Sequence, residues 1–298
     1  MSETTIKIED LKFSYGRKEV LNGVELGVPE GSIFGFLGRN SAGKTTTIKL
    51  LLGLLKADEG CCRIQGIDPR KDSIGVRRIV GYMAEDQQMY GWMRIEQIVK
   101  WVASFYQEWD NKFTNHLLDM LELSGKSKVK TLSKGQNSRL ALLLALGHRP
   151  KVVILDDPTL GLDPIARKDF LRHVIELLQT NGVTVFFSSH LLYEIEPVAD
   201  HIAILNKGII IKASKTEQLR ESVRKFILVP RGEVNFSRMS GVLDVLRAGE
   251  NVSVTVEDCD EAKRTEIKGM SANGRQETAL NLDEIFEAYV IGNRGVLH

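Results

Sequence analysis

The chain has 298 residues, of which 43% are hydrophobic and 27% charged, as in soluble globular proteins. Its 40 basic and 39 acidic residues leave a net charge of +1, so we expect no nucleic-acid partner. Three cysteines, of which Cys61 and Cys62 are adjacent, make neither a disulfide framework nor a metal knuckle. The first ten residues lack the features of a secretion signal, and no apolar run reaches the ~20 residues that cross a bilayer. We therefore expect a cytoplasmic protein, for which another chain would provide any membrane part.

Hydrophobic periodicity predicts a strand at 5–15, then an apolar strand, a Gly-rich loop and a helix over 31–55. Further strands are predicted at 60–66, 77–83, 151–157, 182–190 and 201–211, and helical periodicity runs from 89 to about 148. Strands that alternate with helices indicate an α/β fold with a parallel sheet. After Ala213 weaker strand-like pieces (225–230 and 251–256) and a helix (281–290) predict a small α/β domain. The expected division is 1–213 and 214–298.

The segment GRNSAGKTT (38–46) matches the phosphate-binding pattern G-x-x-x-x-G-K-[ST] between a predicted strand and a predicted helix. Glycines let backbone N–H groups curl around phosphates, and the helix that starts near Lys44 directs its positive end at them. Lys44 can reach the terminal phosphates, and the Thr45 hydroxyl can bind Mg²⁺. A chance match in an ordinary strand, turn and helix is the alternative. The loop residues expected to contact the nucleotide are Gly38, Arg39, Asn40, Ser41, Ala42, Gly43, Lys44, Thr45 and Thr46.

A second signal is KVVILDDPTLGLDP (151–164), in which an apolar run ends in Asp156 and Asp157. Ligands of open α/β sheets collect outside the carboxyl ends of strands. Taken alone, the pair is equally compatible with a capped turn.

With LSKGQ (132–136), at the characteristic distance before the paired acids, the chain resembles the nucleotide-binding subunit of ABC transporters over about Ile6 to Ala213. The resemblance implies a P-loop NTPase fold with a mixed sheet, an antiparallel β subdomain and a helical subdomain at about 89–148. Its later segments SSHLLYEIEPVAD (188–200) and LDEIFEAYV (282–290) are most similar to those of bacterial export-type systems. On its own, LSKGQ is also compatible with a helix N-cap and turn.

The resemblance implies ATP and Mg²⁺ as ligands and gives roles to single residues. Tyr15 matches the aromatic residue that stacks on adenine, although a core tyrosine is the alternative. Asp156 matches a Mg²⁺ ligand, Asp157 the carboxylate next to the attacking water, and His190 the histidine at the γ-phosphate. Glu85 stands where the family usually has a Gln that contacts Mg²⁺, but the register is open because Gln87 and Gln88 follow closely. A structural histidine and a solvated loop acid remain the alternatives for His190 and Glu85.

In the family that the chain resembles, the LSKGQ residues of one subunit act on the ATP that is bound by the other subunit. Ser133, Gly135 and Gln136 would cover the γ-phosphate of ATP that is bound by a second ATP-binding subunit. Whether that subunit is an identical chain stays open.

Four residues depart from the family pattern. Asp157 replaces the usual Glu, Glu85 the usual Gln, and Ser41 and Lys134 two usual glycines. Asp157 is one methylene shorter than Glu, and a misplacement of about 1 Å can cost ~100-fold in rate. Slow and normal hydrolysis are both compatible with these changes.

The implied partner is a transmembrane permease at the inner face of the cell membrane. Tyr90, Trp92 and Met93 are candidates for its docking groove or, equally, for an ordinary helical core. The rival interpretation is a regulatory or soluble ABC-type ATPase that binds ATP and hydrolyses it slowly.

Overall fold

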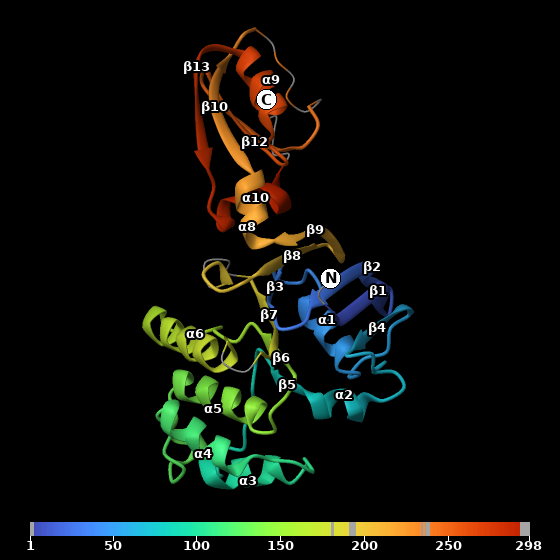
Figure 1. Cartoon of the computed structure of the whole chain (residues 1–298), viewed down its shortest axis with the longest axis vertical. Helices are drawn as coiled ribbons and strands as arrows, with labels where there is room; N and C mark the ends of the chain where they lie inside the picture. The colour runs from blue at the N-terminus through green and yellow to red at the C-terminus, as the bar shows by residue number, and fades with distance from the viewer. Residues whose placement is uncertain are drawn as a thin grey trace. The chain divides into compact units, whose positions relative to one another are not determined.

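The computed structural model describes residues 3–179, 182–190, 195–232, 234, 236 and 239–292. The described residues up to His190, together with Val198–Ala213, form one compact unit (Figure 1). The described residues of 195–197 and those from Ser214 onward form a second unit.

The first unit is built on a six-stranded sheet in the order β5-β6-β7-β3-β8-β9. The pairings from β5 to β8 are all parallel, which confirms the predicted parallel sheet. Every residue of β3, β6 and β7 is buried, as expected for strands that are covered on both faces. The strands are β3 (Ile33–Leu37), β5 (Val80–Met83), β6 (Val152–Asp156), β7 (Thr184–Ser189), β8 (His201–Asn206) and β9 (Ile209–Lys215).

An antiparallel sheet in the order β2-β1-β4 lies on one side of this unit (Figure 1). Its strands are β1 (Thr4–Tyr15), β2 (Lys18–Pro29) and β4 (Glu59–Ile64). The sequence did not predict β2, because Asn22 and Gly23 read as a turn. Gly23 instead has a φ of 79° and lies in an irregular part of the pairing with β1. The strand predicted at 77–83 was partly wrong, since residues up to Ile79 belong to α2 (Ser73–Ile79).

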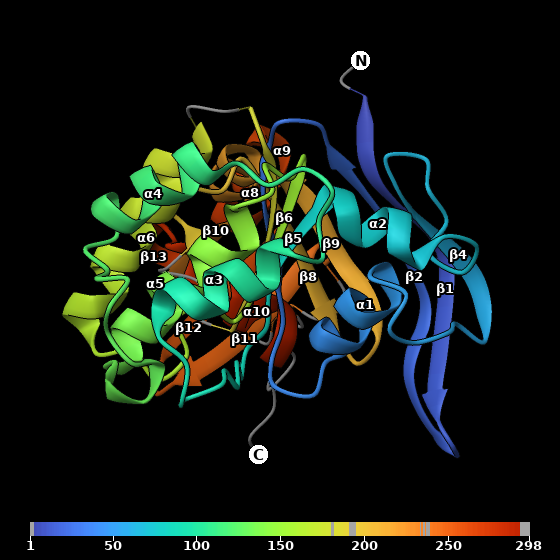
Figure 2. The same cartoon turned by 90° about the horizontal axis from the view of Figure 1, so that it is seen from below.

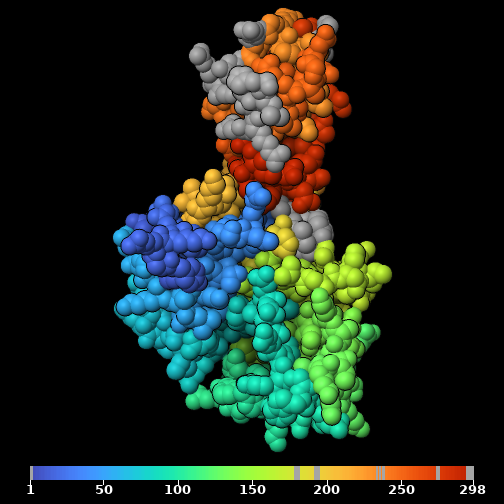
Figure 3. All heavy atoms as spheres, turned by 180° about the vertical axis from the view of Figure 1, so that it is seen from behind, coloured from blue at the N-terminus to red at the C-terminus, as the bar shows by residue number. Residues whose placement is uncertain are grey.

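Helices cover the opposite side of the unit, where α3 (Ile95–Ala103), α4 (Asn111–Met120), α5 (Lys134–Leu146) and α6 (Pro164–Gln179) gather (Figure 2). A short 3-10 helix, η1 (Val129–Thr131), precedes α5. In Figure 3 the blue N-terminal residues of this unit lie on the left and the green residues of its helices on the right. Helices α3, α4 and α5 all fall within 89–148, so the helical periodicity predicted there is confirmed.

The second unit contains a four-stranded antiparallel sheet in the order β11-β12-β10-β13 with its own core around Phe226, Val254 and Ile267. Its elements are α8 (Thr216–Ser222), β10 (Arg224–Pro230), β11 (Val242–Ala248), β12 (Asn251–Val256), α9 (Glu261–Gly269), β13 (Ser271–Ala279) and α10 (Leu282–Ile291). The predicted pieces correspond to β10, β12 and α10, whereas α8, β11, α9 and β13 were not predicted. In the described part of the chain, no helix is both long and apolar enough to span a bilayer.

A buried histidine makes the stability of the helical part depend on pH. The His148 ring stacks on Tyr106 with 4.1 Å between centroids, and burial lowers the pKa of His148 from 6.5 to about 4. As the pH falls from 6.5 to 4, the unfolded chain therefore takes up this proton before the folded chain does. Protonation in the unfolded state then removes up to about 3 kcal/mol of stability.

We expect His148→Phe to lose less stability than the wild type between pH 6.5 and 4. Urea unfolding followed by tryptophan fluorescence measures this, because all three tryptophans lie between residues 92 and 109. His116→Gln, which changes an exposed histidine of α4, is the matched control. Equal pH dependence of wild type and His148→Phe would contradict the assignment.

Candidate functional site

The loop between β3 and α1 (Lys44–Leu51) has a backbone that requires glycine at two positions. Gly43 caps α1 with a φ of 115°, and a Cβ atom there would lie 2.6 Å from Leu21 Cδ2. A Cβ atom on Gly38 would lie 2.7 Å from the Leu205 carbonyl oxygen. Ser41 has a φ of 66°, the left-handed region, where a non-glycine residue costs about 1 kcal/mol. The serine that stands at this position of the loop is therefore modestly strained.

Lys44 is buried at the start of α1, where its side chain is only 5% exposed. Its Nζ donates a hydrogen bond to the Gly38 carbonyl oxygen at 2.9 Å and lies 3.3 Å from Asp157 Oδ2. The lysine thus connects the first residue of the loop to the end of β6. Helix α1 begins at Lys44, as predicted.

Asp156 is fully buried at the last position of β6, where the Ser188 hydroxyl donates to its Oδ1 at 2.6 Å. Burial raises the pKa of Asp156, while the Ser188 and Thr45 hydroxyls act in the opposite direction. Its Oδ2 is buried without a hydrogen-bond partner among the described residues. An unpaired buried carboxylate oxygen is costly, and a cation beside it would remove that cost.

These groups fit Mg²⁺, which prefers one or two carboxylates together with hydroxyl, water and phosphate oxygens. No group of three or more His, Cys, Asp or Glu side chains in the described chain is arranged to hold a metal. A metal at Asp156 and Thr45 would accordingly rely on oxygens of a bound nucleotide.

Asp157 follows the strand with a left-handed φ of 43° and is also buried. Its backbone N–H donates to the Ser188 carbonyl oxygen at 3.0 Å. Its Oδ1 accepts the His190 backbone N–H at 3.1 Å and lies 2.7 Å from His190 Nδ1. With Lys44 on Oδ2, both carboxylate oxygens are held between a lysine and a histidine.

A cavity of about 550 Å³ opens beside these groups in the first unit. Tyr15, which is half exposed and packs edge-on against Phe13, lines it. Glu85 lines it too, whereas Gln87 and Gln88, the alternative register, do not. The lining residues are Tyr15, Lys18, Glu19, Val20, Arg39, Asn40, Ser41, Gly43, Lys44, Thr45, Thr46, Glu85, Asp157 and Lys207.

Glu85 lies close enough to both aspartates to interact with them electrostatically. Burial raises the pKa of Glu85, and the charges of Asp157 and Asp156 raise it further. Glu85 and Asp157 therefore line the cavity beside the phosphate loop, and buried Asp156 lies close enough to interact with Glu85.

The LSKGQ residues do not line this cavity in the described chain. Ser133 caps α5: its Oγ accepts the Gln136 backbone N–H at 3.2 Å, and Gln136 Oε1 accepts the Ser133 N–H at 3.0 Å. Gly135 faces Ala166 of α6. The N-terminal end of α5 is thus held by a capping box, and its residues lie outside the cavity.

Sequence reasoning missed Ser188, Lys18 and Lys207. A signal for Ser188 existed in the sequence, because it follows an apolar run. In the structure it pairs in register with Asp156 across the parallel strands β6 and β7. Lys18 and Lys207 reach the cavity only through the tertiary fold, and no local pattern distinguishes them.

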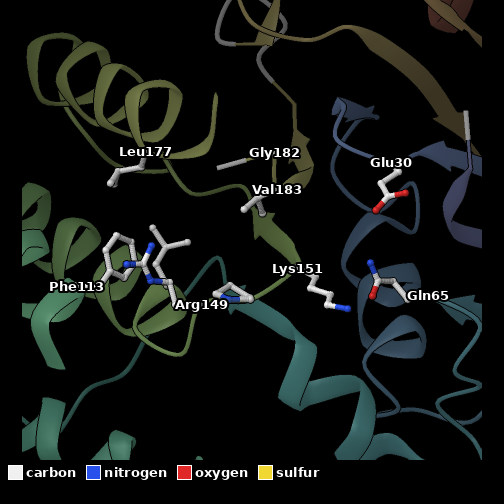
Figure 4. A pocket seen from close by; sticks show the side chains of 10 residues that line it. Glu30, Gln65, Phe113, Arg149, Lys151, Leu177, Gly182 and Val183 are labelled. Atoms are coloured by element: carbon white, nitrogen blue, oxygen red, sulfur yellow. The ribbon is translucent and has the colours of Figure 1, made fainter. Parts of the chain in front are cut away.

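A second cavity of about 420 Å³ lies at the amino ends of the strands (Figure 4). Its Arg149 is 3.7 Å above the Phe113 ring and already forms an ion pair with Asp110 at 3.1 Å. Figure 4 shows Glu30 at the other end of this cavity and Lys151 between. Its described lining residues include no phosphate-binding loop and no helix start, so the first cavity is the candidate functional site.

A phosphate loop at a helix start and two buried acids at a strand end define a P-loop ATP-binding protein. Residues 21–160 match the family described as ABC transporter. The uncharacterized ABC transporter ATP-binding protein YdbJ of Bacillus subtilis (strain 168) is 35% identical over 74% of this chain and 73% of its own length. The bacitracin transport ATP-binding protein BcrA of Bacillus licheniformis is 34% identical over 75% and 74%. The chain belongs to the ABC transporter ATP-binding protein family.

The likeness to one relative includes the second unit. The ABC transporter ATP-binding protein YtrB of Bacillus subtilis (strain 168) is 28% identical over 97% of this chain and 99% of its own length. Among solved structures, an ATP-binding subunit of an ABC transporter has a TM-score of 0.66 at 27% identity and covers 73% of this chain and 92% of its own. The predicted α/β P-loop fold is therefore confirmed.

Ser188 gives the first test of the site. We expect Ser188→Ala to reduce the gain in nucleotide affinity that Mg²⁺ provides by roughly tenfold, because Asp156 loses the hydroxyl that orients it. Affinity without Mg²⁺ should change little. Titration of ADP with and without Mg²⁺ measures the difference, and Ser188→Thr, which keeps the hydroxyl, should retain most of the gain. An unchanged Mg²⁺ effect in Ser188→Ala would show that Asp156 is oriented by other groups.

Proposed function

We propose that this chain is a Mg²⁺-dependent ATPase that drives a separate transmembrane permease from the inner face of the cell membrane. The observation that carries the proposal is the meeting of the phosphate loop, buried Lys44 and Asp157 beside one cavity, with Asp156 buried at the adjacent end of β6. Phosphoryl transfer needs positioning and charge stabilisation more than covalent chemistry, and these groups are arranged for both.

Each residue takes a role that its surroundings support. The loop N–H groups and Lys44 bind the β- and γ-phosphates, and Tyr15 stacks on adenine. Asp156 and Thr45 would hold Mg²⁺, with Glu85 beside them. The metal, when bound, neutralises charge on the phosphate oxygens.

Asp157 is the proposed general base, which orients and polarises the attacking water. Its Oδ1 lies 2.7 Å from His190 Nδ1, so the histidine fixes the carboxylate as well as contacting the γ-phosphate. A general base must come within ~2.6–3.2 Å of the water oxygen. The short Asp side chain meets this condition only if the water lies close to the β6 end.

The end of α5 supports the proposal of a second ATP-binding subunit. Ser133 and Gly135 stand at an exposed helix N-terminus, which attracts anions, but they do not line the cavity of their own chain. We propose that they, with Gln136 supporting the cap, cover the γ-phosphate in a partner subunit. Closure around two ATP molecules would then alternate with opening after hydrolysis.

Asp157→Asn tests the catalytic role. We expect ATP turnover to fall at least about 100-fold, because an amide cannot accept the water proton, while ATP still binds. Lys44→Ala should lose both turnover and tight ATP binding. Steady-state Mg²⁺-ATPase assays beside ATP-binding titrations distinguish the two. Full activity of Asp157→Asn would remove Asp157 from the mechanism, and a silent wild type that Asp157→Glu activates would favour a regulatory ATP-binding protein.

An exposed aromatic cluster marks the proposed permease contact. Tyr90, Trp92, Trp101 and Phe105 are 40–68% exposed, and their neighbouring rings lie 5.0–6.1 Å apart. Isolated exposed apolar residues are ordinary, whereas a contiguous group of large ones marks an interaction surface. Names of relatives refer to bacitracin and lantibiotic transport, so an export-type permease is the proposed partner.

We expect Trp92→Ser combined with Phe105→Ser to reduce sedimentation of the chain with native membranes that contain the permease. ATPase activity in solution should stay unchanged, because neither residue lines the cavity. Ile74→Ser, a change of another exposed apolar residue, is the matched control. Undiminished membrane binding by the double variant would refute this contact surface.

A further inference from the structure

The turn between β8 and β9 is fastened to the phosphate loop. The Gly208 N–H donates to the Ala42 carbonyl oxygen at 3.2 Å, and the Asn22 N–H donates to the Gly208 carbonyl oxygen at 2.9 Å. A Cβ atom on Gly208 would lie 2.4 Å from the Val20 carbonyl oxygen, so the turn fits closely against β2. The position of the turn is therefore fixed relative to both the loop and β2.

Lys207 occupies the left-handed corner of this turn, with a φ of 49°. It is exposed and lines the 550 Å³ cavity. Within the described chain it has no ion pair, unlike Lys44, whose charge is opposed by Asp157. A closely packed backbone thus presents a cation that forms no ion pair with any carboxylate of the described residues.

The two anchors of the turn indicate which part of a nucleotide this cation meets. Ala42 belongs to the phosphate loop, and Val20 lines the cavity near Tyr15. If the loop holds the β- and γ-phosphates and Tyr15 holds the adenine, then Lys207 lies between them. The anionic group of a nucleotide in that position is the α-phosphate, next to the ribose.

We propose that Lys207 is an additional nucleotide-binding residue, which contacts the α-phosphate and ribose portion of the nucleotide. The inference rests on the proposed function, because it takes the cavity to be the nucleotide site. Since the contact does not involve the γ-phosphate, it serves ATP and ADP equally. It therefore sets the affinity for the nucleotide without distinguishing substrate from product.

Lys207→Asn and Lys207→Arg provide a matched pair of variants. Asn tolerates the left-handed backbone at least as well as Lys, so Lys207→Asn removes the charge without straining the turn. Lys207→Arg keeps the charge. Lys56→Met removes another exposed lysine that does not line the cavity.

Calorimetric titration with ADP and with a non-hydrolysable ATP analogue tests the proposal. We expect Lys207→Asn to weaken binding of both ligands by the same factor, about three- to tenfold, and to lessen its dependence on salt. Lys207→Arg and Lys56→Met should bind as the wild type does, and thermal stability without nucleotide should be equal in all four proteins.

Three outcomes separate the possibilities. Equal binding by Lys207→Asn and wild type overturns the inference and leaves the proposed function intact. Weakening of the ATP analogue alone also overturns it, because the contact would then be with the γ-phosphate. If the wild type binds neither ligand, the proposed function itself fails.

Discussion

The buried ion pair between Lys44 and Asp157 is the interaction on which the site depends. Their side chains are only 5% and 7% exposed, so removal of Asp157 leaves the Lys44 charge buried without this ion pair, and removal of Lys44 leaves the buried carboxylate with His190. The pair joins the first residue of α1 to the end of β6. Because β6 and β3 belong to the same parallel sheet, the fold brings a phosphate loop and a carboxylate together at one edge. The geometry of the site is thus a consequence of strand order.

The balance of charge at this edge explains why a divalent cation suits the site. Burial raises the pKa of Glu85, and the nearby charges of Asp157 and Asp156 raise it further. A triphosphate would add more negative charge than Lys44 can neutralise. The Glu85 carboxylate adds to this negative charge and so increases the benefit of a cation near the unpaired oxygen of Asp156.

Local patterns in the sequence were sufficient for features that depend on neighbours along the chain. The buried strand β6 and the start of α1 at Lys44 were predicted because apolar runs and glycine spacing are local signals. Strand β2 was missed, since Asn22 and Gly23 imitate a turn where the structure has an irregular strand. Lys207 was missed for a different reason: only the packing of its turn against the phosphate loop brings it to the cavity. Contacts between distant segments leave no such periodic trace.

The backbone conformation at position 157 gives a physical reason for an aspartate there. Its φ of 43° lies in the left-handed region, which Asp and Asn adopt more readily than longer side chains do. The residue therefore relieves strain at the turn after β6, while its carboxylate still reaches Lys44 and His190. Asp at this position is compatible with the fold and with the charge network. In the proposed mechanism the Asp157 carboxylate acts on the attacking water only where that water lies close to the end of β6, so the position of the water sets the rate of hydrolysis.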